Sequence, residues 1–155
     1  MIIALLCIAA MTTLAYRTIQ HKWVVYRGAE MLYQKKDYKE AIPRYVSLLE
    51  KGFKSPVVLS RLGEMYLATS DLDKARLAYE DILKNDPLNT HTRIALADIY
   101  MRLGEYQKTI NLYMMLLNSK PEDRFLHILL ARTFTAKGDF ENAITHYRIA
   151  LGEKL

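Results

Sequence analysis

Acidic side chains recur in this chain at an interval of 34 residues. Glu30, Glu64 and Asp98 hold the same place in three successive segments, and Arg132 holds that place in a fourth. Carboxylates that share one surface can pair with the Lys or Arg side chains of another molecule. The same acids also fit a strip that faces only water, where charge pairs contribute little. Both interpretations fit the sequence about equally well.

Other polar residues give little support for catalysis. The four histidines, His21, His91, His127 and His146, are scattered, and none stands four residues from another. The chain has no Gly-rich phosphate loop, no HExxH sequence and no nucleophile elbow. Its single cysteine, Cys7, excludes a disulfide within one chain and a cysteine-ligated zinc site. We therefore expect a non-enzyme with no catalytic residues, no metal and no cofactor.

Paired helices are the elements that must position the acids. In residues 56–89, one apolar stripe at helical spacing precedes a turn at Ser70 and Asp71, and a second stripe follows the turn. The stripes are formed by Leu59, Leu62, Gly63 and Tyr66, and by Leu72, Ala75, Tyr79 and Ile82. The pattern reappears in residues 22–55, 90–123 and 124–155, with turns at Lys36–Asp37, Gly104–Glu105 and Gly138–Asp139. A period of this size is typical of stacked helical hairpins.

The first of these units, residues 22–55, is the most degenerate. Asp37 follows its turn and Glu40 stands three residues later, which predicts a reciprocal capping box at the start of the second helix. Pro43 lies inside that helix, where proline removes one backbone hydrogen bond, so we expect a kink there.

The small and aromatic residues of these units resemble the tetratricopeptide repeat family. The second unit carries the family pattern as Gly63, Tyr66, Leu72, Ala75, Tyr79 and Pro87, and the fourth as Ala131, Phe134, Phe140, Ala143, Tyr147 and Ala150. The third has Thr109 where alanine is usual, and the first has Phe53 where proline is usual. The resemblance covers residues 22–155 and implies an all-α fold, a right-handed α-solenoid of four helical hairpins.

Residues 1–21 differ in character from the repeats. Residues 1–16 carry no charge and would extend roughly 24 Å as a helix, against the ~30 Å hydrocarbon core of a bilayer. Thr18 and Ile19 close that gap if Arg17 reaches the interface. We expect an N-terminal transmembrane helix that runs without a break into the first repeat. The alternatives are a cleaved secretory signal, which would lack its usual N-terminal Lys or Arg, and a buried core helix.

Positive charge is concentrated just after this apolar run. Of the net charge of +5, Arg17, Lys22 and Arg27 supply three, and no acid precedes Glu30. Basic residues on that side predict a single-pass membrane protein with its repeats on the cytoplasmic side. The repeats themselves show no basic face, so nucleic acid is not an expected partner.

The resemblance also implies where a protein partner binds, because the first helix of each hairpin lines a concave groove in this family. The partner-binding candidates are Trp23, Tyr26, Glu30, Tyr33, Val57, Ser60, Glu64, Leu67, Ile94, Asp98, Met101, Phe125, Ile128 and Arg132. Their apolar and aromatic character favours a helix or extended peptide that carries one or more Lys or Arg. Family members that clamp a C-terminal carboxylate use Lys and Asn at positions held here by Tyr26, Glu30, Ser60 and Glu64, so no such clamp is expected.

The last helix of the chain predicts a second interface. Solenoids usually finish with a polar capping helix, whereas this one carries Ile144, Tyr147 and Leu151. We expect either that the chain is truncated before such a helix, or that a partner subunit or a second copy of the chain covers these three residues.

These features together predict a non-catalytic, membrane-anchored scaffold or adaptor for protein–protein interaction. It would act as an assembly factor or accessory subunit of a membrane protein complex. The alternative is an exported periplasmic or envelope protein of a secretion or envelope-assembly system, made with a cleaved signal.

Overall fold

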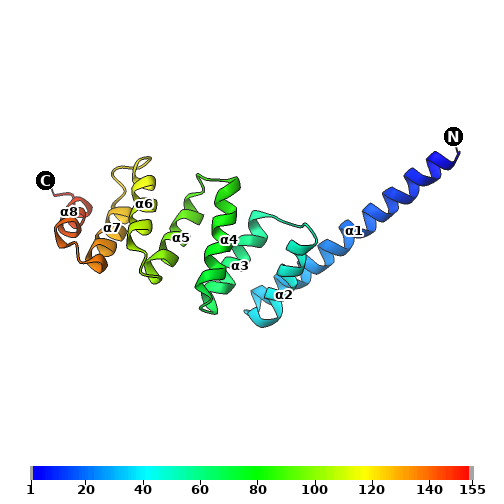
Figure 1. The fold of residues 1–155 in the computed structure, drawn as a ribbon, viewed down its shortest axis with the longest axis horizontal. Helices are drawn as coiled ribbons and strands as arrows, with labels where there is room; N and C mark the ends of the chain where they lie inside the picture. Colours follow the sequence, from blue (N-terminus) through cyan, green and yellow to red (C-terminus); the bar gives the residue numbers. More distant parts are fainter. Residues whose placement is uncertain (1, 154–155) are drawn as a thin grey trace. The chain divides into compact units, whose positions relative to one another are not determined.

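The computed structural model describes residues 2–153 of the 155-residue chain, without the side chains of residues 2, 3, 5, 6, 9, 18 and 19. Eight α-helices make up this part of the chain, and it holds no strand, which confirms the all-α prediction (Figure 1). They are α1 (Ile2–Gln34), α2 (Tyr38–Glu50), α3 (Pro56–Ala68), α4 (Leu72–Asn85), α5 (Thr90–Arg102), α6 (Tyr106–Leu117), α7 (Arg124–Lys137) and α8 (Phe140–Leu151).

The chain divides into two compact units. The first, Met1–Thr69, holds α1 to α3, and the second, Ser70–Leu155, holds α4 to α8. In the first unit α1 packs on α2 and α2 on α3, and in the second each helix from α4 to α8 packs on the next along the chain. Each unit therefore has a core of its own.

A residue with positive φ marks each predicted turn. Lys36 and Ser70 adopt φ of 60° and 62°, while Gly104 and Gly138 adopt 74° and 85°. The next residue in each case is the N-cap of the following helix: Asp37, Asp71, Glu105 and Asp139. The left-handed residue reverses the chain tightly, and glycine adopts that conformation at least cost. The predicted turns are confirmed at these residues.

The capping box predicted in the first unit is wrong. Asp37 occupies the N-cap position of α2, but its side chain accepts no backbone hydrogen bond there. Asp71 and Asp139 have similar backbone angles, and each accepts from the N–H three residues on. In those two helices the third residue is Lys74 or Asn142, and its side chain also donates a hydrogen bond to the capping aspartate. In α2 the third residue is Glu40, whose negative charge repels that of Asp37. Downstream, α2 runs through Pro43 without ending.

The two cores combine small and aromatic residues of the repeat pattern with aliphatic side chains. In the first unit the buried cluster consists of Ala29, Ala41, Tyr45, Leu48, Val58, Leu62 and Met65. In the second it consists of Ala97, Ile110, Tyr113, Leu116, Leu117, Leu126, Leu130, Phe134 and Ala143. Alanine at the crossing points lets helices approach closely, and the rings fill the space beside them. These residues are therefore scaffold.

The long first helix begins well outside the first core. Figure 1 shows α1 continuing far beyond α2 as a single helix, which confirms the predicted absence of a break. Ile8, Met11, Leu14 and Tyr16 on this extension are exposed. In the described part of the chain, however, no helix combines the length and the apolar character needed to cross a membrane. Several side chains of the apolar run lie outside the described residues, so the predicted transmembrane helix stays a prediction.

Candidate functional site

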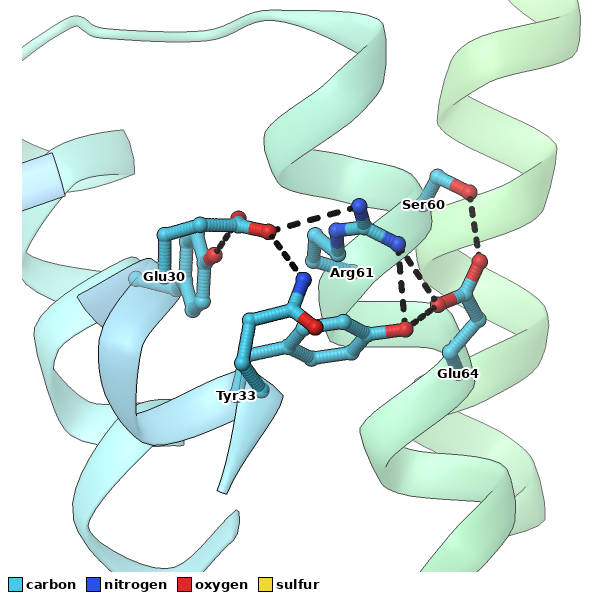
Figure 2. A network of polar contacts seen from close by, with 7 residues as sticks. Glu30, Tyr33, Ser60, Arg61 and Glu64 are labelled. Carbon is cyan, nitrogen blue, oxygen red and sulfur yellow. Dashed lines mark hydrogen bonds and ion pairs between the residues drawn. The ribbon is translucent and has the colours of Figure 1, made fainter. Parts of the chain in front are cut away.

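A network of charged and aromatic side chains joins α1, α2 and α3 in the first unit. Arg61 on α3 lies between Glu30 on α1 and Glu64 on its own helix, as Figure 2 shows. Its Nη2 stands 3.4 Å from Glu30 Oε1, and its Nη1 stands 3.2 Å from Glu64 Oε2. The guanidinium also lies over the ring of Tyr33, 4.2 Å from its centre. Two of the 34-residue-spaced acids thus share one cation.

Hydroxyl groups complete the binding of both carboxylates. Tyr45 donates to Glu30 Oε2 at 2.6 Å, and Tyr33 donates to Glu64. Arg61 Nη1 donates to the Tyr33 hydroxyl at 3.0 Å, which closes the network. We call these residues, Glu30, Tyr33, Tyr45, Arg61 and Glu64, the Arg61 network.

The ionisation of the network follows from these contacts. Burial alone would raise the pKa of Glu30, but hydrogen bonds from Tyr45 and Gln34 and the charge of Arg61 hold that pKa below its usual value. Burial raises the pKa of Tyr33, and so does its hydrogen bond to the Glu64 carboxylate. Burial likewise raises the pKa of Tyr45, as does its bond to Glu30. Around neutral pH the two tyrosines are therefore donors, and the Glu30 carboxylate is a charged acceptor.

Helical spacing explains why these residues meet. Glu30 and Tyr33 are three apart on α1, and Arg61 and Glu64 are three apart on α3, so each pair lies on one helix face. Tyr45 is buried in the core on α2, and only its hydroxyl reaches Glu30. The sequence places the acids on this face, but nothing in their spacing indicates that Arg61 and two tyrosines of the same unit would occupy them.

An aromatic cluster lies beside the network. Trp23 packs edge-on against Tyr26 and Phe53 at ring-centre distances of 5.8 Å each, and Tyr26 packs edge-on against Tyr45 at 6.2 Å. Phe53 takes the place of the usual proline of the repeat pattern, so the departure from that pattern serves to build this cluster. Trp23 nevertheless keeps about half of its surface exposed (51%).

The second unit has a hollow on the corresponding helices. It has a volume of about 160 Å³ and lies where α5 begins, α6 ends and α7 begins. Its lining comprises Leu88, Thr90, Arg93, Ile94, Leu116, Ser119, Lys120, Asp123, Phe125 and Leu126. Ile94 and Phe125 are partner-binding candidates from the sequence, and both reach the surface. We call this feature the Phe125 hollow.

The third acid of the series is also paired within its own helix. Asp98 Oδ2 stands 2.9 Å from Nε of Arg102, and both side chains are about half exposed. Arg132, which holds the same place in the last repeat, is exposed. None of the three acids is therefore without a basic neighbour.

All the predicted partner-binding residues keep part of their surface exposed. Trp23, Val57, Phe125, Ile128 and Arg132 are the most exposed, and the others are half-buried: Tyr26, Glu30, Tyr33, Ser60, Glu64, Leu67, Ile94, Asp98 and Met101. The core aromatics Tyr45, Tyr79, Tyr100, Tyr113 and Phe134 are buried instead. A role of the exposed set in binding stays a prediction.

The last helix exposes the residues predicted for a second interface. Ile144, Tyr147 and Leu151 are all exposed. The helix α8 ends at Leu151, and Gly152 caps it in the left-handed conformation with φ 78°. An interface there also stays a prediction.

Sequence reasoning missed a histidine pair. His127 on α7 and His146 on α8 bring their Nδ1 atoms within 2.9 Å, and His127 Nε2 lies 2.8 Å from the Pro121 carbonyl oxygen. The His146 ring also stacks on Phe134. Burial and the neighbouring His127 lower the pKa of His146. Among the described residues no cluster of three or more His, Cys, Asp or Glu could hold a metal ion, so we treat the pair as a contact between helices.

Known proteins share this fold. The chain is similar to the solved structure of MamA (TM-score 0.73, 16% identity, covering 84% of this chain and 77% of that one). It is also similar to residues 41 to the end of MamA from Desulfovibrio magneticus RS-1 (TM-score 0.73, 14% identity, 84% and 74% covered) and to MamA AMB-1 (TM-score 0.70, 20% identity, 85% and 72% covered). At such identities the likeness shows the fold alone. No curated protein gives a significant match.

Family models match nearly the whole repeat region. Three models, each described as a tetratricopeptide repeat, match residues 26–90, 70–133 and 126–155. These segments overlap and together span the residues that carry the small and aromatic pattern. The chain belongs to the tetratricopeptide repeat family.

Proposed function

We propose that this protein is a non-catalytic scaffold that binds segments of partner proteins on the first helices of its hairpins. The observation that carries the proposal is the exposure of large apolar side chains on those helices. Trp23 on α1, Val57 on α3, and Phe125 and Ile128 on α7 are each 40% exposed or more, although the core residues of the same helices are buried. Apolar side chains gathered on one face usually mark an interaction site.

The polar residues on these helices support a role in binding and not in catalysis. The Arg61 network engages its acids, its cation and its tyrosine hydroxyls with one another, so it offers a rigid surface on which one of the two carboxylate charges is offset. A rigid surface loses little conformational entropy when a partner binds. The apolar side chains beside the network, Trp23 and Tyr26, then provide the area to be buried.

Site-specific photocrosslinking tests this proposal. A photoreactive phenylalanine analogue replaces Tyr26, Leu67 or Met101 on the first helices, in cells that make the full chain. Matched controls carry it at Leu77 on α4 and Met115 on α6, which are exposed apolar residues of the second helices. We expect discrete adducts of a few fixed masses from the first-helix positions only. Equal adducts from Leu77 and Met115 would contradict the proposal.

The exposed start of α1 supports a narrower version of this function. Ile8, Met11, Leu14 and Tyr16 give this end of α1 an uncovered apolar surface, and apolar helices of this kind associate with membranes or with the helices of membrane subunits. In this version the protein is an accessory subunit or assembly factor of a membrane complex, with its repeats on the cytoplasmic side.

Membrane fractionation and intact mass test the narrower version together. We expect the full chain to sediment with membranes, to resist carbonate extraction, and to co-purify with membrane subunits at constant ratio after detergent extraction. A Met11→Glu, Leu14→Glu variant should move to the soluble fraction. A mature mass that lacks roughly the first sixteen residues would favour the exported alternative, with a cleaved signal.

A further inference from the structure

The Phe125 hollow differs from the Arg61 network in the charge that it leaves uncompensated. Arg93 on α5 and Lys120 before α7 line it, and neither forms an ion pair within the described residues. Asp123 is the one acid of the lining, and its Oδ1 accepts the N–H groups of Phe125 and Leu126 as the cap of α7. The carboxylate is thus held by the helix N-terminus, and the two cations remain available to a ligand.

The floor and rim of the hollow are apolar. Leu116 and Leu126 lie at its base and are buried, while Leu88 and Phe125 stand at its edge with 77% and 58% of their surfaces exposed. Its volume of about 160 Å³ is close to that of an engineered protein cavity of about 150 Å³ that binds benzene. One leucine or phenylalanine side chain of a partner fills such a space.

From these two features we infer that the Phe125 hollow binds an acidic peptide segment through one bulky apolar side chain. The apolar side chain enters between Leu88 and Phe125, and carboxylates on either side of it pair with Arg93 and Lys120. The inferred partner segment is acidic, whereas the spacing of Glu30, Glu64 and Asp98 predicts a segment that carries Lys or Arg. Each of those acids already pairs with an arginine of this chain. The inference rests on the proposed scaffold function and names the partner class for one part of it.

Fluorescence anisotropy with three labelled nine-residue peptides and the full chain tests the inference. The first peptide has a central Leu-Phe pair flanked by Asp and Glu, the second has the same pair flanked by Lys, and the third keeps the acids but has Ser-Ser at its centre. We expect the first to bind at least about tenfold more tightly than either of the others. Its affinity should fall as salt rises, since exposed charge pairs are screened.

Variants of the lining locate the site. Arg93→Gln with Lys120→Gln should weaken the acidic peptide about tenfold, and Phe125→Ser should weaken it by a similar factor. The matched control is Lys84→Gln with Lys137→Gln, which removes the same charge elsewhere in this unit and should leave affinity unchanged. All five side chains are at least partly exposed, so the variants should fold, and circular dichroism checks that they do.

Each other outcome overturns the inference. Equal or tighter binding of the Lys-flanked peptide would show that the hollow does not prefer acidic segments. An equal loss of affinity in the control variant would show that Arg93 and Lys120 do not form the binding site. If none of the peptides binds while the first-helix crosslinks form, the hollow is not the docking site and the scaffold function stands. If the crosslinks are absent as well, both fail.

Discussion

The Arg61 network and the Phe125 hollow lie on first helices of the same kind of hairpin, yet they offer a partner opposite conditions. In the network both carboxylates are engaged within the unit, because Arg61 pairs with Glu30 and Glu64, and hydroxyl groups of Tyr45, Tyr33 and Ser60 donate to them as well. In the hollow Arg93 and Lys120 face a pocket whose one acid caps a helix. The position of a residue in the repeat predicts which face of the helix it lies on. Whether its charge is available to a partner depends on the side chains that pack beside it.

The largest expected effect comes from removing the shared cation. Arg61→Met should lower the free energy of unfolding by about 2 kcal/mol, because Glu30 and Glu64 lose their counter-charge in a half-buried setting. Urea unfolding followed by circular dichroism measures the loss, and hydrogen exchange should place it in α1 to α3. Arg93→Met is the control, and we expect it to stay within about 0.5 kcal/mol of the parent. Equal losses of unfolding free energy in the two variants would contradict the proposed difference, because Arg93 would then stabilise the fold as much as Arg61 does.

Replacing the N-cap residues of α8 and α2 should give an intermediate effect on stability, and the effect should differ between the two units. Asp139→Ala removes a side chain that accepts the Asn142 N–H, and it should destabilise the start of α8. Asp37→Ala removes no cap bond and should be nearly neutral. Differential exchange of the amides at the starts of α8 and α2 measures both changes. A clear cost for Asp37→Ala would mean that this residue caps α2 in solution.

The smallest expected effect is a difference in pH response. The folded-state pKa of His146 lies below its usual 6.5, so the unfolded chain binds more protons below that pH, and the α7–α8 hairpin should weaken as pH falls from about 7.5 to 5.5. The pKa of Glu30 lies below its usual 4.5, so its contribution is fully present above about pH 4.5 and is lost only at lower pH. Hydrogen exchange at pH 7.5 and 5.5, corrected for intrinsic rates, should therefore change in α7 and α8 and stay constant in α1 to α3.

His146→Phe serves as the matched variant for that experiment. It keeps an aromatic ring against Phe134 but cannot take a proton, so the change between pH 7.5 and 5.5 should disappear. Persistence of the change in this variant would assign it to another group.

The sequence predicts well what is determined locally. The all-α fold and the turns at Lys36, Ser70, Gly104 and Gly138 depend on short-range spacing and backbone preference, and the structure confirms them. The family pattern correctly predicts that Tyr45 and Tyr113 are buried, but it is wrong for Phe140 and Tyr147 of the fourth repeat, which are exposed. These features could be found because the residues that decide them are neighbours in the chain.

Contacts between helices were the harder part. Arg61 meets Glu30 from another helix, and the two residues are 31 positions apart. His127 and His146 also meet across a hairpin, and the signal that could have found them is their placement on facing sides of α7 and α8. The transmembrane helix expected from apolar composition stays a prediction, because several side chains of that run lie outside the described residues. Side-chain pairing across helices depends on rotation about the helix axis, which spacing alone does not determine.

The unbroken course of α1 has a mechanical consequence. Because the apolar end and the helix that carries Glu30 are one α-helix, the two are locked in rotational phase. Inserting one alanine between Arg17 and Lys22 would turn the apolar end by about 100° relative to Glu30 and move it about 1.5 Å along the axis. Inserting seven alanines would restore the phase to within about 20°. Whatever holds the apolar end therefore also sets the direction in which the first hairpin faces.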